Sequence, residues 1–189
     1  MYVEFISNVY KVGDRNIIQC NIRDITERVL AQNSVVFISH HDTLTNLYNR
    51  SFFDEEMRRL EHSRQFPISI FMVDVDGLKA INDQHGHTVG DEVLRRAAKV
   101  LRAAFRDEDV LARIGGDEFA IILPNTDAKA ASNAQKRVES FLKQHNEEHP
   151  DLPLRLSIGV ATGTRQFSLL LLLKKADDLM YMEKRLKTH

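Results

Sequence analysis

Runs of apolar residues alternate with helical patterns from residue 41 to the end of the chain. Continuous apolar runs rich in β-branched residues predict strands over 68–75, 110–114, 118–123 and 154–162. Around these runs, apolar residues at helical spacing predict helices over 50–64, 88–105, 127–146 and 168–187. From the first predicted strand to the last, the order of elements is therefore βαββαβ.

This order is typical of a ferredoxin-like or palm-type α+β fold, in which helices cover one face of an antiparallel sheet. In that topology the first strand lies beside the third. The end of the run Met72-Val73-Asp74 is therefore expected next to the turn that precedes the third strand, where Asp117 lies. Two acids that are distant in the sequence would then converge.

The first forty residues follow a different pattern. Apolar residues alternate with polar ones on both sides of the turn signal at 13–16, which predicts a two-stranded hairpin. Asp24 or Thr26 can then cap a helix that runs to about Ser39. Within this helix a short heptad repeat could pair two copies of the chain, or could simply be the apolar side of a linker helix; its members are Ile25, Val29, Gln32 and Val36.

Composition narrows the class of protein. A chain of 189 residues that is 43% hydrophobic and 28% charged can bury one main core plus a short appendage. Cys20 is the only cysteine, so we expect no disulfide within the chain and a reducing, cytoplasmic location. No signal peptide and no membrane-spanning run is found, and even the leucine run at 169–173 is too short. The balance of 26 basic and 27 acidic residues argues against a nucleic-acid-coating or membrane-surface protein.

Candidate chemistry lies at two places along the strands. The segment Arg113-Ile114-Gly115-Gly116-Asp117-Glu118-Phe119 lies between two apolar runs, and its glycines predict a tight hairpin turn with positive φ. Upstream, Asp74 and Asp76 end a strand at period two and so share one of its faces. Adjacent acids beside a glycine-opened backbone suit a metal and phosphate site, although a plain surface turn has the same composition.

Taken together, these segments closely resemble the signature of the GGDEF family of diguanylate cyclases. The residues that carry the resemblance are the hairpin above and the stretch from Asp74 to Leu94, with Lys79, Asn82, His87 and Asp91 inside it. The segment His41–Arg50 looks like the family's opening motif, and the segment Ala176–Lys184 looks like its closing motif. Four motifs in the same order argue strongly against a chance match.

The resemblance implies a nucleotidyl cyclase-like domain over 41–189 that condenses two GTP into cyclic di-GMP and releases two pyrophosphates. Each domain would hold one GTP, so the enzyme would act as a homodimer. Residues 1–25 resemble the last two strands of a PAS sensor domain, and 26–40 its exit motif and signalling helix, so we expect the natural protein to continue upstream. The alternative is an ordinary N-terminal hairpin packed on the domain.

Metal binding and catalysis involve the acids at the two strand ends. Mg²⁺ (or Mn²⁺) binds a few carboxylates together with substrate oxygens. Asp74 and Asp117 would supply the carboxylates, with Glu118 as a further candidate, and the family pattern adds the carbonyl of Val75. By resemblance, Asp117, Glu118 and Lys79 are catalytic, with Asp117 acting mainly through its charge.

Substrate contacts are also implied by the resemblance. Asn82 and Asp91 match positions that contact guanine, and His87 a position near the sugar and phosphates; Asp91 could alternatively cap a helix that begins near Gly90. Gly116 and Lys184 match further substrate-binding positions, and Arg113 is expected to support the hairpin beside the substrate.

The family's inhibitory product site is an RxxD motif, which Arg106 and Asp109 match in the expected register before Gly115. Arg137 on the following helix falls near a further product-binding arginine. The alternative for Arg106 is a charge that complements the dipole at a helix end.

The chain departs from the family pattern at a few positions. Gly77 and Leu78 follow the second acid where an aromatic residue is common, and Asn46 stands at a frequent glycine position. Lys187-Thr188-His189 replaces the usual Gly-Arg-Asn, so a phosphate-binding arginine is missing or is replaced by Arg185. Two other functions stay open: an idle GGDEF domain that binds GTP or cyclic di-GMP and regulates a neighbour, and a different nucleotidyl transferase with the same sheet.

Overall fold

The computed structural model describes residues 1–187, except for the side chains of residues 12 and 32–36. The chain divides into two compact units, Met1–Ser39 and His40–His189, and each is described by itself. Among the described residues, no helix is both long and apolar enough to cross a lipid bilayer.

The N-terminal unit is a hairpin followed by a helix. Strands β1 (Val3–Val12) and β2 (Arg15–Asp24) pair antiparallel along their whole length, as the alternating pattern predicts. Helix α1 (Thr26–His40) follows, and Asp24 accepts a hydrogen bond from the backbone N–H of Thr26 at 2.8 Å, which fits a capping role. Every side chain of β2 is exposed. The heptad repeat in α1 stays a prediction, because Gln32 and Val36 lie outside the described side chains. The PAS assignment also stays a prediction.

The C-terminal unit is built on a five-stranded sheet in the order β3-β5-β6-β4-β7. Its strands are β3 (Tyr48–Asn49), β5 (Val110–Arg113), β6 (Glu118–Leu123), β4 (Ile68–Val75) and β7 (Leu156–Gly163). All neighbouring strands are antiparallel except the short β3, which was not predicted and pairs parallel with β5. The first strand of the βαββαβ order, β4, lies beside the third, β6, as expected.

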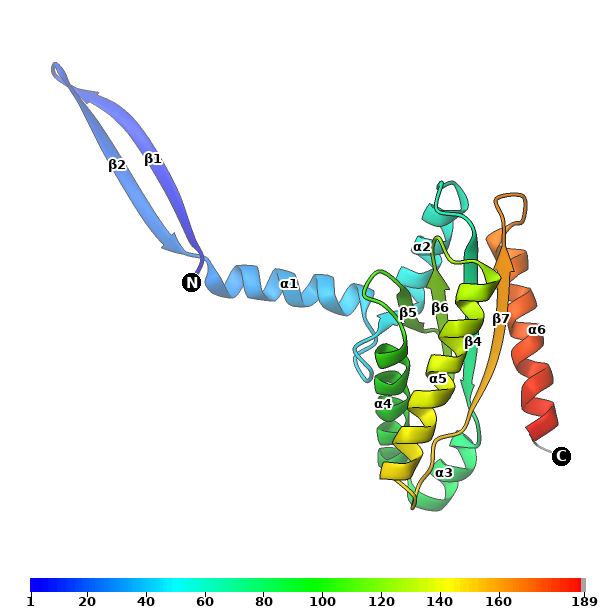
Figure 1. The fold of residues 1–189 in the computed structure, drawn as a ribbon. Coiled ribbons are helices and arrows are strands. Elements are labelled where there is room, and N and C mark those ends of the chain that lie inside the picture. The colour runs from blue at the N-terminus through cyan, green and yellow to red at the C-terminus, as the bar shows by residue number, and fades with distance from the viewer. Residues whose placement is uncertain (188–189) are drawn as a thin grey trace. The chain divides into compact units, whose positions relative to one another are not determined.

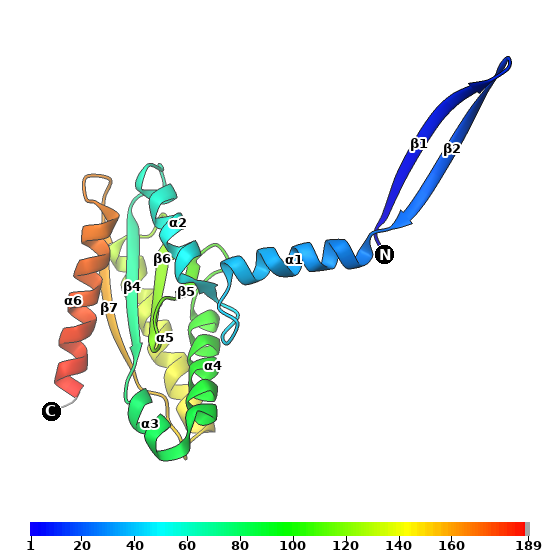
Figure 2. The ribbon, with the colours of Figure 1, turned by 180° about the vertical axis from the view of Figure 1, so that it is seen from behind.

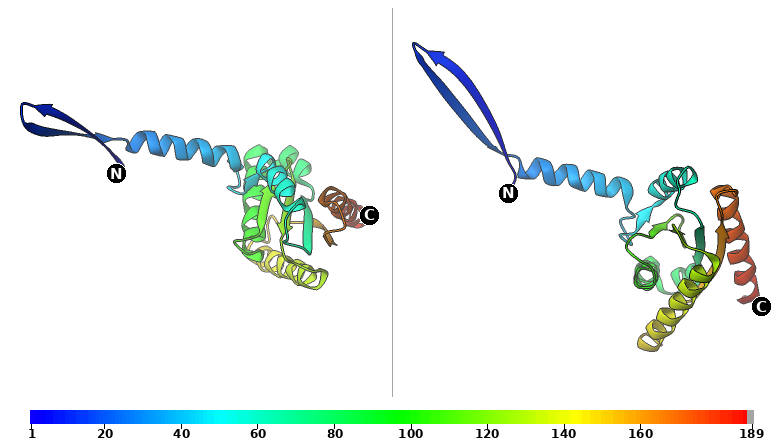
Figure 3. Two further views of the ribbon diagram at one scale, coloured as in Figure 1. Left: turned by 90° about the horizontal axis from the view of Figure 1, so that it is seen from above. Right: turned by 45° about the horizontal axis from the view of Figure 1, so that its top comes forward.

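Helices cover both faces of this sheet. On one face, α4 (His87–Ala104) and α5 (Ala128–Glu148) pack on Phe71 and Val73; on the other, α2 (Arg50–Glu61) and α6 (Leu169–Lys187) pack on Ile70 and Met72 (Figure 1, Figure 2). Figure 3 shows α2 and α5 on opposite sides of the strands. The expectation of a single covered face is therefore wrong. The reason is visible in β4: five of its six residues before Asp74 are apolar, the exception being Ser69, and all six are buried, so both faces of the strand are covered.

An additional helix, α3 (Leu78–His85), precedes α4. Gly77 precedes this helix and Gly86 follows it; their φ angles of 76° and 85° lie in a region that other residues rarely adopt. Because α4 begins at His87, Asp91 lies inside the helix, and the alternative that Asp91 caps it is wrong.

The hairpin between β5 and β6 differs from its expected turn. Neither Gly115 nor Gly116 is among the described residues with positive φ, so the predicted two-residue turn is wrong. The loop is longer, and the N–H groups of Ile114 and Gly115 both point to the carbonyl oxygen of Glu118. A Cβ atom at residue 115 would lie 2.5 Å from Glu118 Oε2, so any other residue there would displace the carboxylate of Glu118.

Candidate active site

The acids of β4 and of the β5–β6 loop meet at one end of the sheet. Asp74 is directly opposite Glu118 in the pairing of β4 with β6, and it is only 4% exposed. The N–H of Val75 donates to the carbonyl oxygen of Asp117 at 3.0 Å, which ties the loop to the end of β4. The structure thus brings together four residues predicted to be catalytic or metal-binding: Asp74, Val75, Asp117 and Glu118.

This arrangement concentrates negative charge. Burial raises the pKa of Asp74; the Lys184 hydrogen bond opposes that rise, and the charges of Asp117 and Asp76 add to it. Burial also raises the pKa of Glu118, with further contributions from Asp117 and Asp74. The mutual repulsion of these carboxylates would be relieved by a bound cation.

The donor set fits Mg²⁺ or Mn²⁺ bound together with a substrate. Among the described residues, no group of three acidic, histidine or cysteine side chains is arranged to hold a metal by itself, so the site is not a closed cage. Mg²⁺ characteristically uses one or two carboxylates and completes its shell with water and phosphate oxygens. Asp74 and Asp117, with the carbonyl of Val75, match that requirement.

Lys184 comes from the last turn of α6. Its Nζ lies 2.7 Å from Asp74 Oδ1. Burial alone would lower the pKa of Lys184, but the hydrogen bond and the charge of Asp74 raise it. Helix α6 approaches β7 closely because residue 159 is glycine: a Cβ atom there would lie 1.9 Å from the carbonyl oxygen of Ala176.

Arg113 braces the β5–β6 loop. Its guanidinium donates to both carboxylate oxygens of Asp42, at 3.2 and 3.3 Å, and to the carbonyl oxygen of Gly116, at 2.8 and 3.3 Å. Burial would raise the pKa of Asp42, but hydrogen bonds from Thr45 and the charge of Arg113 lower it. Asp42 belongs to the opening motif, but this ion pair was not predicted from the sequence.

Asn82 lies against Gly90, the neighbour of Asp91, where α3 packs on α4. A Cβ atom at Gly90 would lie 1.9 Å from Asn82 Oδ1, so this glycine makes room for the amide. Asn82 Oδ1 is buried and has no hydrogen-bond partner among the described residues. Asp91 is the next residue of α4 and is partly buried, whereas Lys79 and His87 on the same two helices are exposed.

Asp76, just past the end of β4, is hydrogen-bonded to β7. Its Oδ1 accepts a hydrogen bond from Ser157 Oγ at 2.8 Å. Its Oδ2 is buried and has no partner within the described part of the chain. Ser157 was not predicted, because only the pairing of β4 with β7 brings it to this position.

The residues of the predicted inhibitory site lie together in a separate cavity. Arg106, Asp109 and Arg137 line a small cavity of about 120 Å³ between the end of α4 and the face of α5. Asp109 is 5% exposed, accepts a hydrogen bond from the N–H of Arg106 at 2.8 Å, and has a pKa raised by burial. Arg137 donates to the carbonyl oxygen of Ala104 at 3.0 Å, while the Arg106 side chain is 71% exposed.

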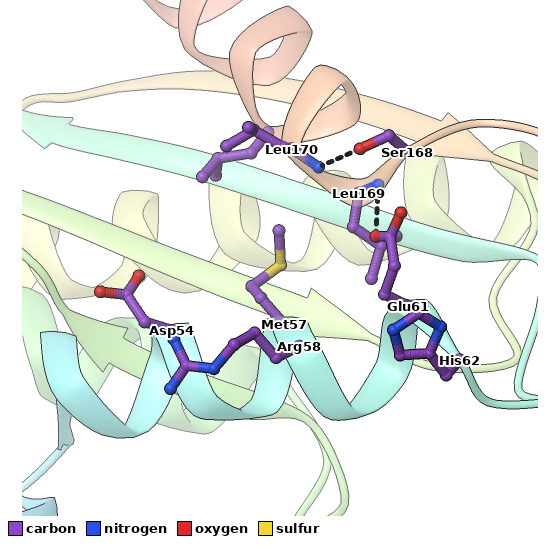
Figure 4. Close-up of a pocket in the computed structure, with 9 residues that line it drawn as sticks. Asp54, Met57, Arg58, Glu61, His62, Ser168, Leu169 and Leu170 are labelled. Atoms are coloured by element: carbon purple, nitrogen blue, oxygen red, sulfur yellow. Dashed lines mark hydrogen bonds between the residues drawn. The ribbon is translucent and has the colours of Figure 1, made fainter.

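Another cavity, of about 430 Å³, lies between α2 and the start of α6 (Figure 4). Glu61 on its wall accepts a hydrogen bond from the N–H of Leu169 at 2.8 Å. It contains no predicted site residue and lies at the first turn of α6, whereas Lys184 lies in the last.

Comparison with known proteins places this geometry in a family. A family model described as "Diguanylate cyclase, GGDEF domain" matches residues 39–189. The chain is 36% identical over 171 residues to the signaling protein YkoW of Bacillus subtilis, covering 86% of this chain and 21% of that protein. It is 33% identical over 178 residues to the diguanylate cyclase DgcM of Escherichia coli, covering 91% and 42%. The chain thus spans less than half the length of these relatives.

A solved structure agrees with this comparison. The GGDEF domain of DgcB from Caulobacter crescentus, in complex with cyclic di-GMP, superposes with a TM-score of 0.71 at 28% identity, over 78% of this chain and 88% of that one. The fold is therefore the α+β, nucleotidyl cyclase-like fold expected from the sequence. With the family match over most of its length, the chain belongs to the GGDEF diguanylate cyclase domain family.

Proposed function

We propose that residues 41–189 form an active diguanylate cyclase domain, which condenses two GTP into cyclic di-GMP and releases two pyrophosphates. The observation that carries the proposal is the hydrogen bond from Val75 to Asp117, which fixes Asp74 and Asp117 at one strand end. Diguanylate cyclase is also the name of the E. coli relative.

The reaction requires a 3′-hydroxyl to attack an α-phosphate while pyrophosphate leaves. Asp74, Asp117 and the Val75 carbonyl would hold Mg²⁺ or Mn²⁺, which when bound neutralises charge on the phosphate oxygens. Glu118, next to Asp117, adds a carboxylate whose raised pKa reflects the same crowding. Lys79 is exposed in the first turn of α3 and would bind a phosphate. The positive charge of Lys184 would offset the negative charges of Asp74 and of the incoming phosphates.

Guanine recognition would come from the contact of α3 with α4. The N1–H and N2–H₂ groups of guanine need acceptors, which Asn82 and the Asp91 carboxylate would supply; Asn82 lies against Gly90, the residue before Asp91. Adenine lacks the N2 donor and would leave Asp91 without a partner, which costs binding free energy. His87, at the first turn of α4, would lie near the sugar and phosphates.

Two domains must face each other, because each binds one GTP and neither can close the product ring alone. Residues 26–40 would bring two copies together, and residues 1–25 would be the end of a PAS sensor domain. On this proposal the rate per molecule rises with protein concentration. Activity strictly proportional to enzyme over a wide dilution series, from a protein that stays monomeric, would contradict it.

Product inhibition would use the cavity between α4 and α5. Arg106 has an exposed guanidinium suited to a phosphate or a guanine edge, and Asp109 and Arg137 lie in the same cavity. Cyclic di-GMP bound there would act away from the acids of β4.

The experiment that tests the activity is turnover of GTP and of ATP with Mg²⁺, followed as pyrophosphate release. We expect release from GTP and very little from ATP. Equal release from both would contradict the guanine site and favour another nucleotidyl transferase. GTP binding without release would contradict the cyclase and favour a regulatory binding module.

A further inference from the structure

Strand β7 forms one edge of the sheet, and only β4 pairs with it among the described strands. In an antiparallel pair, residues that bond to the neighbouring strand alternate with residues whose N–H and C=O groups point away from it. The N–H of Asp76 donates to the carbonyl oxygen of Arg155, so the odd-numbered residues along β7 point toward β4. The even-numbered residues, from Leu156 to Thr162, therefore present their backbone groups to the free edge.

Helix α6 covers the first half of this edge. Glu183 Oε2 accepts a hydrogen bond from the N–H of Ile158 at 2.8 Å, and Lys187 Nζ donates to the carbonyl oxygen of Leu156 at 2.6 Å. Glu183 and Lys187 are also ion-paired with each other at 2.6 Å. These contacts agree with the direction deduced for the even-numbered residues, and they close this half of the edge to a further strand.

The second half of the edge is open. The N–H groups of Val160 and Thr162 have no hydrogen-bond acceptor among the described residues. Both residues line a groove of about 370 Å³ between α5 and α6, and both are partly exposed, whereas residues 156–159 are buried. Unpaired N–H and C=O groups on an edge strand can pair with one more strand.

We propose that this groove binds an extended, acidic segment of a partner protein, which adds to β7 as a further strand beside Val160 and Thr162. In this kind of recognition the main-chain hydrogen bonds provide affinity, and the side chains of the groove select the sequence. The inference goes beyond the proposed function and does not depend on it.

The shape of the groove favours a single strand over the edge of a second sheet. Helix α5 packs on one face of the sheet and α6 on the other, and in Figure 3 the orange strand β7 lies between them. A second copy of β7 would approach with its own α5 and α6, whereas an extended segment brings no helices. The lining residues of α5 are small or polar, which leaves room for side chains of the added strand; they are Ala128, Ala131, Ser132 and Gln135.

The charge of the groove indicates the chemistry of the partner. Among the described residues that line it, Lys175 is the only charged one, and it is exposed and has no ion pair with the described part of the chain. An acidic side chain on the added strand would complement its ammonium group. A lysine beside an edge strand can alternatively serve only to keep the edges of two copies apart. The two roles predict different behaviour when the charge is reversed.

The test uses three synthetic peptides and the ¹⁵N-labelled chain, observed by NMR. The first peptide is Thr-Val-Glu-Val-Thr with blocked ends, because β-branched residues favour a strand. The second has lysine in place of glutamate, and the third is the first peptide with methylated backbone nitrogens, which cannot donate to a strand. The first peptide should shift the amide signals of Val160 and Thr162 and slow their exchange with deuterium. We expect the second and third to bind at least about tenfold more weakly, equivalent to about 1.4 kcal/mol.

Lys175→Glu and Lys174→Glu form a matched pair of variants. The two lysines are adjacent and exposed, but only Lys175 lines the groove. Lys175→Glu should reverse the preference, so that the lysine peptide binds more tightly than the glutamate peptide. Lys174→Glu should keep the preference of the unchanged protein. An unchanged preference in Lys175→Glu would contradict the acidic partner and leave Lys175 as an edge guard only.

Other outcomes would overturn the inference through the edge itself. Absence of shifts at Val160 and Thr162 with the glutamate peptide at millimolar concentration would show that the groove takes no strand. Equal binding of the methylated peptide would show that the main chain of the ligand is not used. Slow deuterium exchange of both amides in the concentrated protein alone, lost on dilution, would show that the edge pairs two copies of this chain instead of binding a partner.

Discussion

Lys184 and Asp74 form an ion pair, with 2.7 Å between Nζ and Oδ1, although 110 residues separate them in the chain. The pair connects the last helix to the end of the central strand. The acid is buried and the lysine is about one-third exposed, so the positive charge can move toward a ligand while the carboxylate stays fixed. The position of α6 on the sheet therefore sets the charge balance of the site.

Replacing either acid at this strand end by its amide should abolish cyclic di-GMP formation. We expect Asp74→Asn and Asp117→Asn each to lower turnover by about a hundredfold or more, because each removes a metal-binding carboxylate. Burial already disfavours the charge of Asp74, so the neutral amide should not reduce thermal stability. Circular dichroism and turnover check both expectations, with the exposed Asp178→Asn as control. Turnover retained by either amide would contradict the metal assignment.

The two glycines of the β5–β6 loop should respond differently to alanine. At Gly115 the new Cβ would lie 2.5 Å from Glu118 Oε2, so that carboxylate must move and turnover should fall about tenfold or more even with saturating GTP. At Gly116 no atom lies within 4 Å of the new Cβ, so the fold should be unaffected and any loss should appear as a higher KM for GTP. Steady-state kinetics of both variants decide this, and identical kcat values would contradict the role given to Glu118.

Removing the exposed arginine of the inhibitory cavity should weaken product inhibition. We expect Arg106→Ala to raise the cyclic di-GMP concentration needed for inhibition about tenfold or more, with the initial rate of GTP turnover little changed. Lys136→Ala is a suitable control, because Lys136 is an exposed cation beside Arg137. Calorimetry with cyclic di-GMP measures the affinity directly. Equal affinities of Arg106→Ala and the unchanged protein would mean that Arg106 has no part in product binding.

Acid should destabilise the contact between α4 and the end of α5. The buried Arg96 donates to His145 Nε2 at 2.9 Å, which requires a neutral imidazole. Burial lowers the pKa of His145, and the charges of Arg96, His149 and Lys99 lower it further. Only the charge of Glu148 opposes this shift by raising the pKa. Because the folded pKa lies below the unfolded value, this contribution to stability is complete above about pH 6.5 and is lost as the pH falls through the folded pKa.

The slope of the free energy of unfolding from this one group cannot exceed about 1.4 kcal/mol per pH unit. Urea unfolding at several pH values checks it. His145→Gln keeps an acceptor for Arg96 and should reduce the dependence on pH, whereas His62→Gln, at an exposed histidine, should not. The same dependence on pH in His145→Gln would contradict this explanation.

The central strand and the convergence of Asp74 with Asp117 could be predicted from the sequence, because a continuous apolar run and a βαββαβ order leave few topologies. Helix α3 could not, since its apolar residues are few and its bounds depend on the backbone of Gly77 and Gly86. The apolar residues on both faces of β4 indicate a sheet covered by helices on both sides, but a sheet covered on one side was expected.

Partners supplied by tertiary structure were the hardest to foresee. The pairing of Arg113 with Asp42 joins segments 71 residues apart, and no local pattern marks it. The same holds for Ser157 beside Asp76, which lie 81 residues apart and meet only because β7 adds to the edge of the sheet.

The mass of the product formed from GTP tests the central claim most directly. After incubation of the chain with GTP and Mg²⁺, at a protein concentration high enough for two domains to meet, mass spectrometry should show cyclic di-GMP. Asp117→Asn should give none under the same conditions. Cyclic di-GMP formed at an undiminished rate by Asp117→Asn, or GTP left unchanged by the folded protein at every concentration, would contradict the account.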